Sequence, residues 1–129
     1  MEVNNNPEKR NSNLNFEQRS KKYALDVIAV LRILPRDYIY QTLGKQLLRS
    51  ATSVGANVVE AQAGSSKRDF TNFLSHALKS ANESKFWISL TRDSVGESNI
   101  GAKLDNLYSE TCELANILGA SMLTLKKRR

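Results

Sequence analysis

The segment from Leu47 to Leu90 reads LLRSATSVGANVVEAQAGSSKRDFTNFLSHALKSANESKFWISL, and it predicts two helices joined by a short turn. On both sides of the turn, apolar side chains recur every three or four residues, as in helices with one buried face. We expect Gly64 to take the left-handed position that ends the first helix, and Ser66 to cap the second. Because so short a connection makes the helices antiparallel neighbours, this hairpin is the centre of the predicted fold.

The remaining sequence predicts one more helix on each side of the hairpin. Pro35 ends the first helix, because the residue before proline is pushed away from helical geometry. Asp37 is the expected N-cap of the helix that follows. The predicted helices cover residues 16–34, 38–63, 67–94 and 100–127. The sequence thus predicts an all-α, antiparallel up-down-up-down four-helix bundle over residues 15–129, after a disordered polar arm at residues 1–14.

Composition sets broad limits on class and location. The 129 residues carry a net charge of +6, with 40% hydrophobic residues and one cysteine. No apolar run is long enough for a membrane span, and the N-terminus lacks the apolar region of a secretory signal. We therefore expect a cytoplasmic protein without membrane contact, and the positive charge favours polyanionic partners.

The hairpin contains a series of short motifs: QLLRS at 46–50, TSVGAN at 52–57, Glu60, SK at 66–67, DF at 69–70, LK at 78–79, ANE at 81–83 and FW at 86–87. In these motifs the sequence resembles the family of four-helix-bundle proteins encoded in intervening sequences of bacterial 23S ribosomal RNA genes, and the resemblance spans residues 16–127. It implies a bacterial homopentamer. It also implies a distant relation to the accessory variability protein of diversity-generating retroelements, which binds nucleic acid and partners a reverse transcriptase. It implies no reaction.

Basic side chains are the candidates for contacts with RNA or DNA. They are Lys45, Arg49, Lys67, Arg68, Lys126, Lys127, Arg128 and Arg129. A ring of five chains would repeat each charge and give affinity with little sequence preference. The alternative is that these cations are solvated side chains on exposed helix faces. At Ser65–Arg68 the two interpretations are an anion site at a helix N-terminus and an exposed turn. Tyr38, Tyr40 and Trp87 are not interleaved with the basic runs, which argues against specific reading of single strands.

A second set of polar residues follows one face of the hairpin. Arg49, Ser53, Asn57 and Glu60 share a helical face, and Ser80 and Glu83 are positioned to meet them from the next helix. We interpret these six residues as a structural polar network that fixes helix register or a subunit contact. A ligand pocket and a catalytic site are the alternatives.

Catalytic and metal chemistry find little support. A di-metal bundle needs Glu-x-x-His pairs, whereas this chain has a single histidine, His76, with Phe73 three residues before it. Cys112 and His76 lack an orienting third group, and Gly64–Lys67 is too short for a phosphate-binding loop. We therefore expect no enzyme, no cofactor and no metal. The leading hypothesis is a pentameric protein that binds RNA or DNA; the alternative is an interaction scaffold or accessory subunit, for example of a reverse transcriptase.

Overall fold

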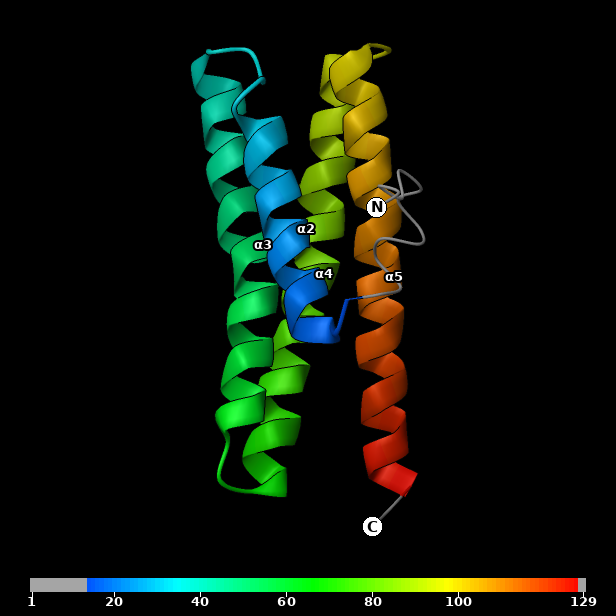
Figure 1. Ribbon diagram of the computed structural model, residues 1–129. Helices are drawn as coiled ribbons and strands as arrows, with labels where there is room; N and C mark the ends of the chain where they lie inside the picture. The colour runs from blue at the N-terminus through cyan, green and yellow to red at the C-terminus, as the bar shows by residue number, and fades with distance from the viewer. Residues whose placement is uncertain (1–13, 128–129) are drawn as a thin grey trace, which may run out of the picture.

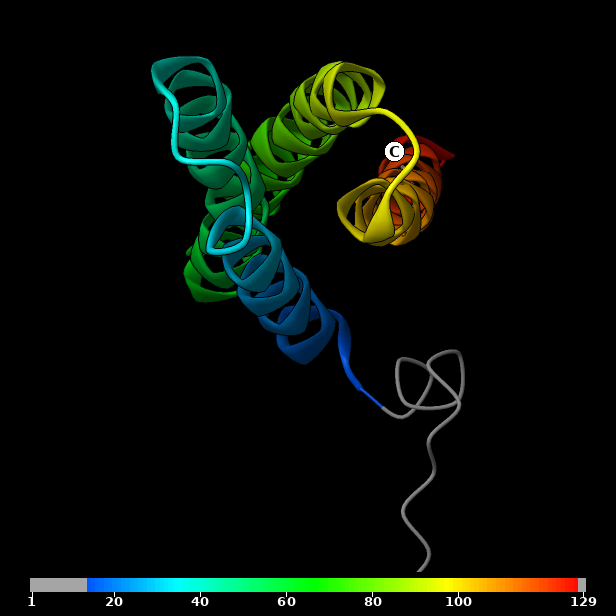
Figure 2. The same ribbon diagram turned by 90° about the horizontal axis from the view of Figure 1, so that it is seen from above.

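The computed structural model describes residues 14–127, which form four helices and no strand. They are α2 (Phe16–Leu31), α3 (Tyr38–Ala63), α4 (Lys67–Val95) and α5 (Asn99–Lys127). Successive helices run in opposite directions (Figure 1), and seen from above α2 lies nearest α3 while α5 lies nearest α4 (Figure 2). The predicted four-helix bundle is confirmed. The arm expected at residues 1–14 falls almost entirely outside the described residues.

The first helix is shorter than predicted. It ends at Leu31 rather than at residue 34. The Arg32 amide still bonds to the Ile28 carbonyl, and the two amides after it bond to carbonyls three residues back, from Ile33 to Val30 and from Leu34 to Leu31. This tightened turn unwinds the chain before Pro35, which disfavours helical geometry in the residue that precedes it. The helix therefore ends before the residue that proline restricts.

Two of the helix caps predicted from the sequence are present in the structure, and one predicted helix end differs. Asp37 accepts a hydrogen bond from the Tyr40 amide at 3.0 Å, and Ser66 accepts one from the Asp69 amide at 3.1 Å. The expectation for Gly64 is wrong, because its backbone is extended, with φ −63° and ψ 141°. The left-handed glycine is Gly96, after α4, with φ +73°. Gly64 is constrained by space instead, since a Cβ atom there would lie 3.1 Å from the Ala61 carbonyl oxygen.

All four helices contribute to the upper half of the core. Its buried apolar residues are Tyr23, Val27, Val30, Leu47, Ala51, Ile88, Leu104, Leu107 and Leu114. Burial of each large side chain contributes on the order of 2 kcal/mol, so this layer supplies much of the driving force for folding. Leu90, which follows the apolar pattern of α4, is 41% exposed, and the buried position in that turn is taken by Ile88.

The lower half of the bundle is built mainly from three helices. The 16 residues of α2 span about 24 Å, whereas the 29 residues of α4 and of α5 each span about 43 Å. Around and below the start of α2, small buried residues of α3, α4 and α5 form a second part of the core, and Phe16 of α2 packs against it. These are Ala61, Ala77, Ala81 and Ala115, among Val54, Val58, Leu74 and Leu118. Within residues 14–127, no helix combines the length and apolar character that a membrane crossing needs.

Candidate nucleic-acid interface

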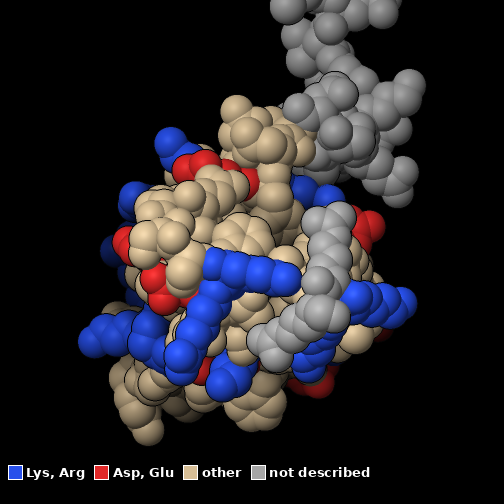
Figure 3. All heavy atoms as spheres, turned by 90° about the horizontal axis from the view of Figure 1, so that it is seen from below, with Lys and Arg blue, Asp and Glu red and all other residues tan. Residues whose placement is uncertain are grey.

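Four predicted cations meet at the lower end of the bundle. Lys67 and Arg68 begin α4, and Lys126 and Lys127 end α5; because these helices are antiparallel, the two pairs share one end. Figure 3 looks onto this end and shows Lys and Arg side chains across it. All four residues are exposed, and none forms an ion pair within residues 14–127. We call Lys67, Arg68, Lys126 and Lys127 the lower basic end. Arg128 and Arg129 lie outside the described residues.

The turn that opens α4 is already partly satisfied by its own side chains. The Ser66 hydroxyl accepts the Asp69 amide, and the Ser65 hydroxyl donates to the Asp69 carboxylate at 3.3 Å. The carboxylate of Asp69 also offsets part of the positive potential of the helix N-terminus. Any anion at this end would therefore be held chiefly by the exposed Lys67 and Arg68 side chains and not by the helix N-terminus.

Lys45 and Arg49 lie apart from the lower basic end. Lys45 is exposed on the upper half of α3. The Arg49 guanidinium forms an ion pair with Glu83 of α4 and donates to the Gln46 side-chain oxygen at 3.1 Å. Glu83 in turn accepts the Trp87 indole N–H at 2.8 Å. The structure thus places Arg49, which was predicted both as a nucleic-acid contact and as a network member, in a polar pairing between α3 and α4.

The remaining members of the predicted polar network do not form one connected set. The Asn57 amide donates to the Ser53 carbonyl at 2.8 Å and to the Ser53 hydroxyl at 3.2 Å, both within α3. Glu60 is exposed, and Ser80 takes part through its carbonyl, which accepts the Ser84 hydroxyl at 2.8 Å. Only the Arg49–Glu83 pair joins predicted residues across the two helices.

A buried set of hydroxyl groups was not predicted. The hydroxyls of Tyr23 and Thr111 lie 2.7 Å apart and join α2 to α5, while the hydroxyls of Ser84 and Ser50 lie 2.8 Å apart and join α4 to α3. Burial raises the pKa of Tyr23 to about 12, against the opposing effect of hydrogen bonds with Thr111 and Ser84. The sequence signal was present, because Thr111 occupies a position in the apolar stripe of its helix. A polar residue there needs a buried partner.

An ion-pair cluster between α2 and α5 was also missed. Arg19 donates from Nε to Glu110 at 3.0 Å and from Nη2 to the same carboxylate at 2.6 Å, and it also pairs with Glu113. The Arg19 side chain is only 14% exposed. Its pKa is raised above the ordinary value, chiefly by the hydrogen bond to Glu110. Spacing within one helix gives no sign of a partner that lies 91 positions away.

The candidates for catalysis and metal binding remain apart. His76 is exposed on α4, and Cys112 is half-buried on α5. No hydrogen bond within residues 14–127 joins them, and the same residues contain no group of three His, Cys, Asp or Glu side chains placed to hold a metal ion. The expectation that the protein has no metal and no catalytic activity stays a prediction.

Comparison with known proteins identifies relatives of this fold. Residues 12–120 match the family model described as 23S rRNA-intervening sequence protein. A crystal structure of a protein with unknown function from the S23 ribosomal protein family of Bacteroides thetaiotaomicron VPI-5482 is similar, with 28% sequence identity and a TM-score of 0.75. The match covers 84% of this chain and 98% of that one. No curated protein sequence matches.

Proposed function

The chain belongs to the family of 23S rRNA-intervening sequence proteins, and from that membership we propose a non-enzymatic, cytoplasmic, homopentameric protein that binds RNA or DNA. The observation that carries the proposal is the lower basic end, where Lys67, Arg68, Lys126 and Lys127 are exposed and lack ion pairs in the described part of the chain. Unpaired surface cations bind phosphates by releasing counterions, which gives affinity with little sequence preference.

Assembly into a ring strengthens this proposal. A single chain offers four described cations at this end, and a pentamer would repeat them five times around one axis. Cations repeated in this way would follow a phosphate backbone without contacting the bases. Lys45 adds a further exposed cation on α3, whereas the pairing of Arg49 with Glu83 leaves that side chain less available.

The test neutralises the lower basic end in two separate pairs. We expect Lys67→Gln with Arg68→Gln, and Lys126→Gln with Lys127→Gln, each to weaken binding to duplex and single-stranded probes of unrelated sequence by a similar factor. We expect Arg49→Gln to weaken binding less than either pair. Fluorescence anisotropy at fixed ionic strength measures these affinities, and unchanged affinity in both double variants would remove the lower basic end from the interface.

A second candidate function is an interaction scaffold or accessory subunit, for example for a reverse transcriptase. It is supported by Phe86, which is 58% exposed on α4 and packs edge-on against Trp87 with 5.0 Å between ring centroids. Large exposed aromatic side chains are typical of surfaces that bind other proteins. Association with a protein partner that does not depend on salt and is weakened by Phe86→Ala would favour this function over nucleic-acid binding.

A further inference from the structure

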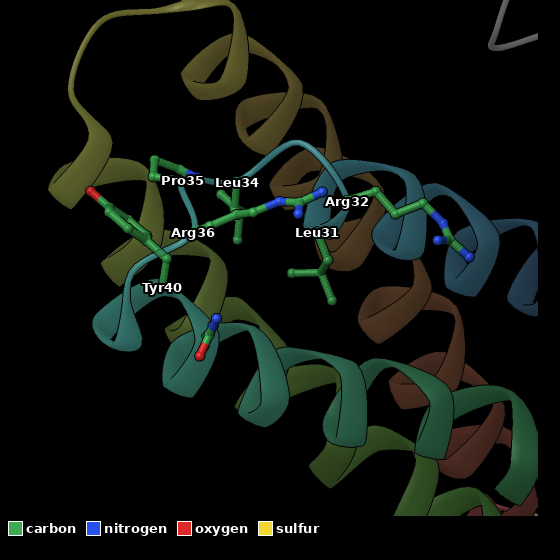
Figure 4. A pocket seen from close by; sticks show the side chains of 7 residues that line it. Leu31, Arg32, Leu34, Pro35, Arg36 and Tyr40 are labelled. Carbon is green, nitrogen blue, oxygen red and sulfur yellow. The ribbon is translucent and has the colours of Figure 1, made fainter.

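A cavity of about 490 Å³ lies at the corner where α2 turns into α3, at the end of the molecule opposite the lower basic end. Leu31, Leu34 and Pro35 give it apolar walls. Arg32, Arg36, Tyr40 and Gln41 complete the lining (Figure 4). Three apolar residues and four polar or charged ones line it, so the cavity offers both apolar contact and hydrogen-bonding groups to a small organic group. The cavity is open to solvent over much of its surface, and its volume falls in the general range of small-molecule sites.

The two arginines at this corner have no partner in the described part of the chain. Both are exposed, and neither Arg32 nor Arg36 forms an ion pair within residues 14–127. The one carboxylate in the connection, Asp37, is engaged as the cap that accepts the Tyr40 amide. Figure 4 shows the Arg36 side chain extending from the connection back toward α2, whereas the Arg32 side chain points away from the connection. Arg36 is therefore the inner cation of the corner and Arg32 the outer one.

An aromatic ring lines the same cavity, and in Figure 4 the Tyr40 side chain extends in the opposite direction from that of Arg36. Tyr40 is half-buried, and its hydroxyl lies 3.1 Å from the Ser94 hydroxyl of α4, which restrains the ring at the cavity wall. Tyr38, two residues earlier, is 77% exposed. Tyr38 and Tyr40 thus lie close in sequence to Arg32 and Arg36, two cations that are not among the basic residues predicted from the sequence to contact nucleic acid. Proteins that hold single strands stack bases on aromatic rings and neutralise phosphates with cations, and this cavity has Tyr40, Arg32 and Arg36 in its lining.

We propose that this corner binds a single-stranded segment of RNA or DNA. One base enters the cavity against Tyr40, and the flanking phosphates contact Arg36 and Arg32. Gln41 offers an amide at the rim for the edge of the base. A duplex cannot use the cavity, because its bases are paired and stacked, so the corner gives a preference for unpaired strands.

This inference rests on the proposed function and adds a second contact to it. The 26 residues of α3 hold the corner and the lower basic end about 39 Å apart. The two sites differ in what they recognise. The lower basic end offers charge alone and is expected to hold duplex and single strands alike, whereas the corner combines charge with a stacking surface.

The experiment compares two fluorescein-labelled probes, an oligouridine of twelve nucleotides and a twelve-base-pair duplex, by anisotropy at one salt concentration. The variants are Arg32→Gln with Arg36→Gln, and Tyr40→Leu. The matched control is Lys79→Gln with Lys103→Gln, which removes the same charge from exposed positions on α4 and α5. Circular dichroism and thermal unfolding confirm that each variant is folded.

We expect both corner variants to lose at least about five-fold in affinity for the single strand and less than about two-fold for the duplex. The control should change the two affinities equally. Equal losses of affinity for both probes in the corner variants, or no loss in either variant, would refute the proposed binding site at the corner. Neither result would contradict binding at the lower basic end. Failure of the unmodified protein to bind either probe would overturn the proposed function itself.

Discussion

The hydroxyl of Tyr23 on α2 lies 2.7 Å from the hydroxyl of Thr111 on α5, inside the core and out of reach of water. This bond joins the two helices whose mutual contact is the smallest among the neighbouring pairs of the bundle. Thr111 also donates to the Leu107 carbonyl at 2.6 Å, so the Tyr23 hydroxyl is the donor between them. The polar bond thus holds the shortest helix of the bundle at one register.

Replacing Tyr23 with phenylalanine keeps the ring and removes this bond. Thr111 keeps its bond to the Leu107 carbonyl, so no buried donor is left unpaired and the loss of stability should be modest, about 1 kcal/mol. Urea unfolding should show a lower midpoint with an unchanged slope. A midpoint equal to that of the unmodified protein would show that the bond contributes nothing.

Tyr23 should also make stability depend on alkaline pH. Its pKa is about 12 in the folded protein against an ordinary value of 10.0, so between these values the unfolded chain releases the proton and the folded chain keeps it. The contribution of this group is fully present below pH 10 and is lost as pH rises toward 12. From pH 9 to pH 11, the stability of the unmodified protein relative to Tyr23→Phe should fall by about 1 kcal/mol. Tyr38→Phe, at an exposed position, is the control, and an equal pH dependence in both variants would refute the assignment.

The Glu83 carboxylate is expected to control the fluorescence of Trp87, the single tryptophan of the chain. Glu83→Gln removes the charge that faces the indole N–H and should shift the emission maximum, whereas Arg49→Gln keeps that contact and should shift it less. Both partners of the ion pair are more than a third exposed, so a double-mutant cycle should give a coupling of only about 0.5 kcal/mol. A larger spectral shift in Arg49→Gln would contradict this arrangement.

The Arg19 cluster should stabilise the attachment of α2. Because Arg19 is largely buried and bonds two carboxylates of α5, Arg19→Gln should cost about 2 kcal/mol and speed amide hydrogen exchange in α2 before the other helices. Lys21→Gln removes an exposed charge from the same helix and serves as the control. Uniformly faster exchange across all four helices would mean that α2 does not open separately.

Two glycines should respond to alanine in opposite directions. Gly96 has φ +73° and ψ −164°, a conformation that L-residues rarely adopt, so Gly96→Ala should destabilise the protein by about 2 kcal/mol. Gly119 lies inside α5 with no atom within 4 Å of an added Cβ, so Gly119→Ala should stabilise by up to about 1 kcal/mol. Thermal unfolding measures both, and a shift of the same sign in the two variants would contradict the backbone assignment.

Local sequence signals predicted the helices, because the spacing of apolar residues, the capping residues and the proline each determine the backbone within a few residues of themselves. The caps at Asp37 and Ser66 are examples. Partners that lie far apart in sequence were not predictable in the same way. Arg19 meets Glu110 only because α2 and α5 are neighbours in the bundle. The Arg49–Glu83 pair, in contrast, joins the two helices of the hairpin, and the sequence analysis placed both residues in one polar network.

The α2–α3 corner illustrates the same limit. Arg32 and Arg36 are separated by Ile33, Leu34 and Pro35 and form no basic run. Only the early end of α2 and the turn at Pro35 bring them to one cavity with Tyr40. At Gly64 a local signal gave a wrong prediction. A glycine after a helix was expected to be left-handed, whereas the chain passes through Gly64 in an extended conformation to reach the cap at Ser66.

The most direct test of the central proposal is the affinity of the unmodified protein for a duplex RNA probe from 50 to 300 mM salt, with the mass in solution measured on the same samples. Each phosphate contact contributes about 0.9 to the slope of log affinity against log salt, so four cations per chain predict a slope of about −3.6 or steeper. We expect that slope from a species of about five chain masses. Absence of binding at 50 mM salt, or an affinity that does not change with salt, would contradict binding through the basic surface.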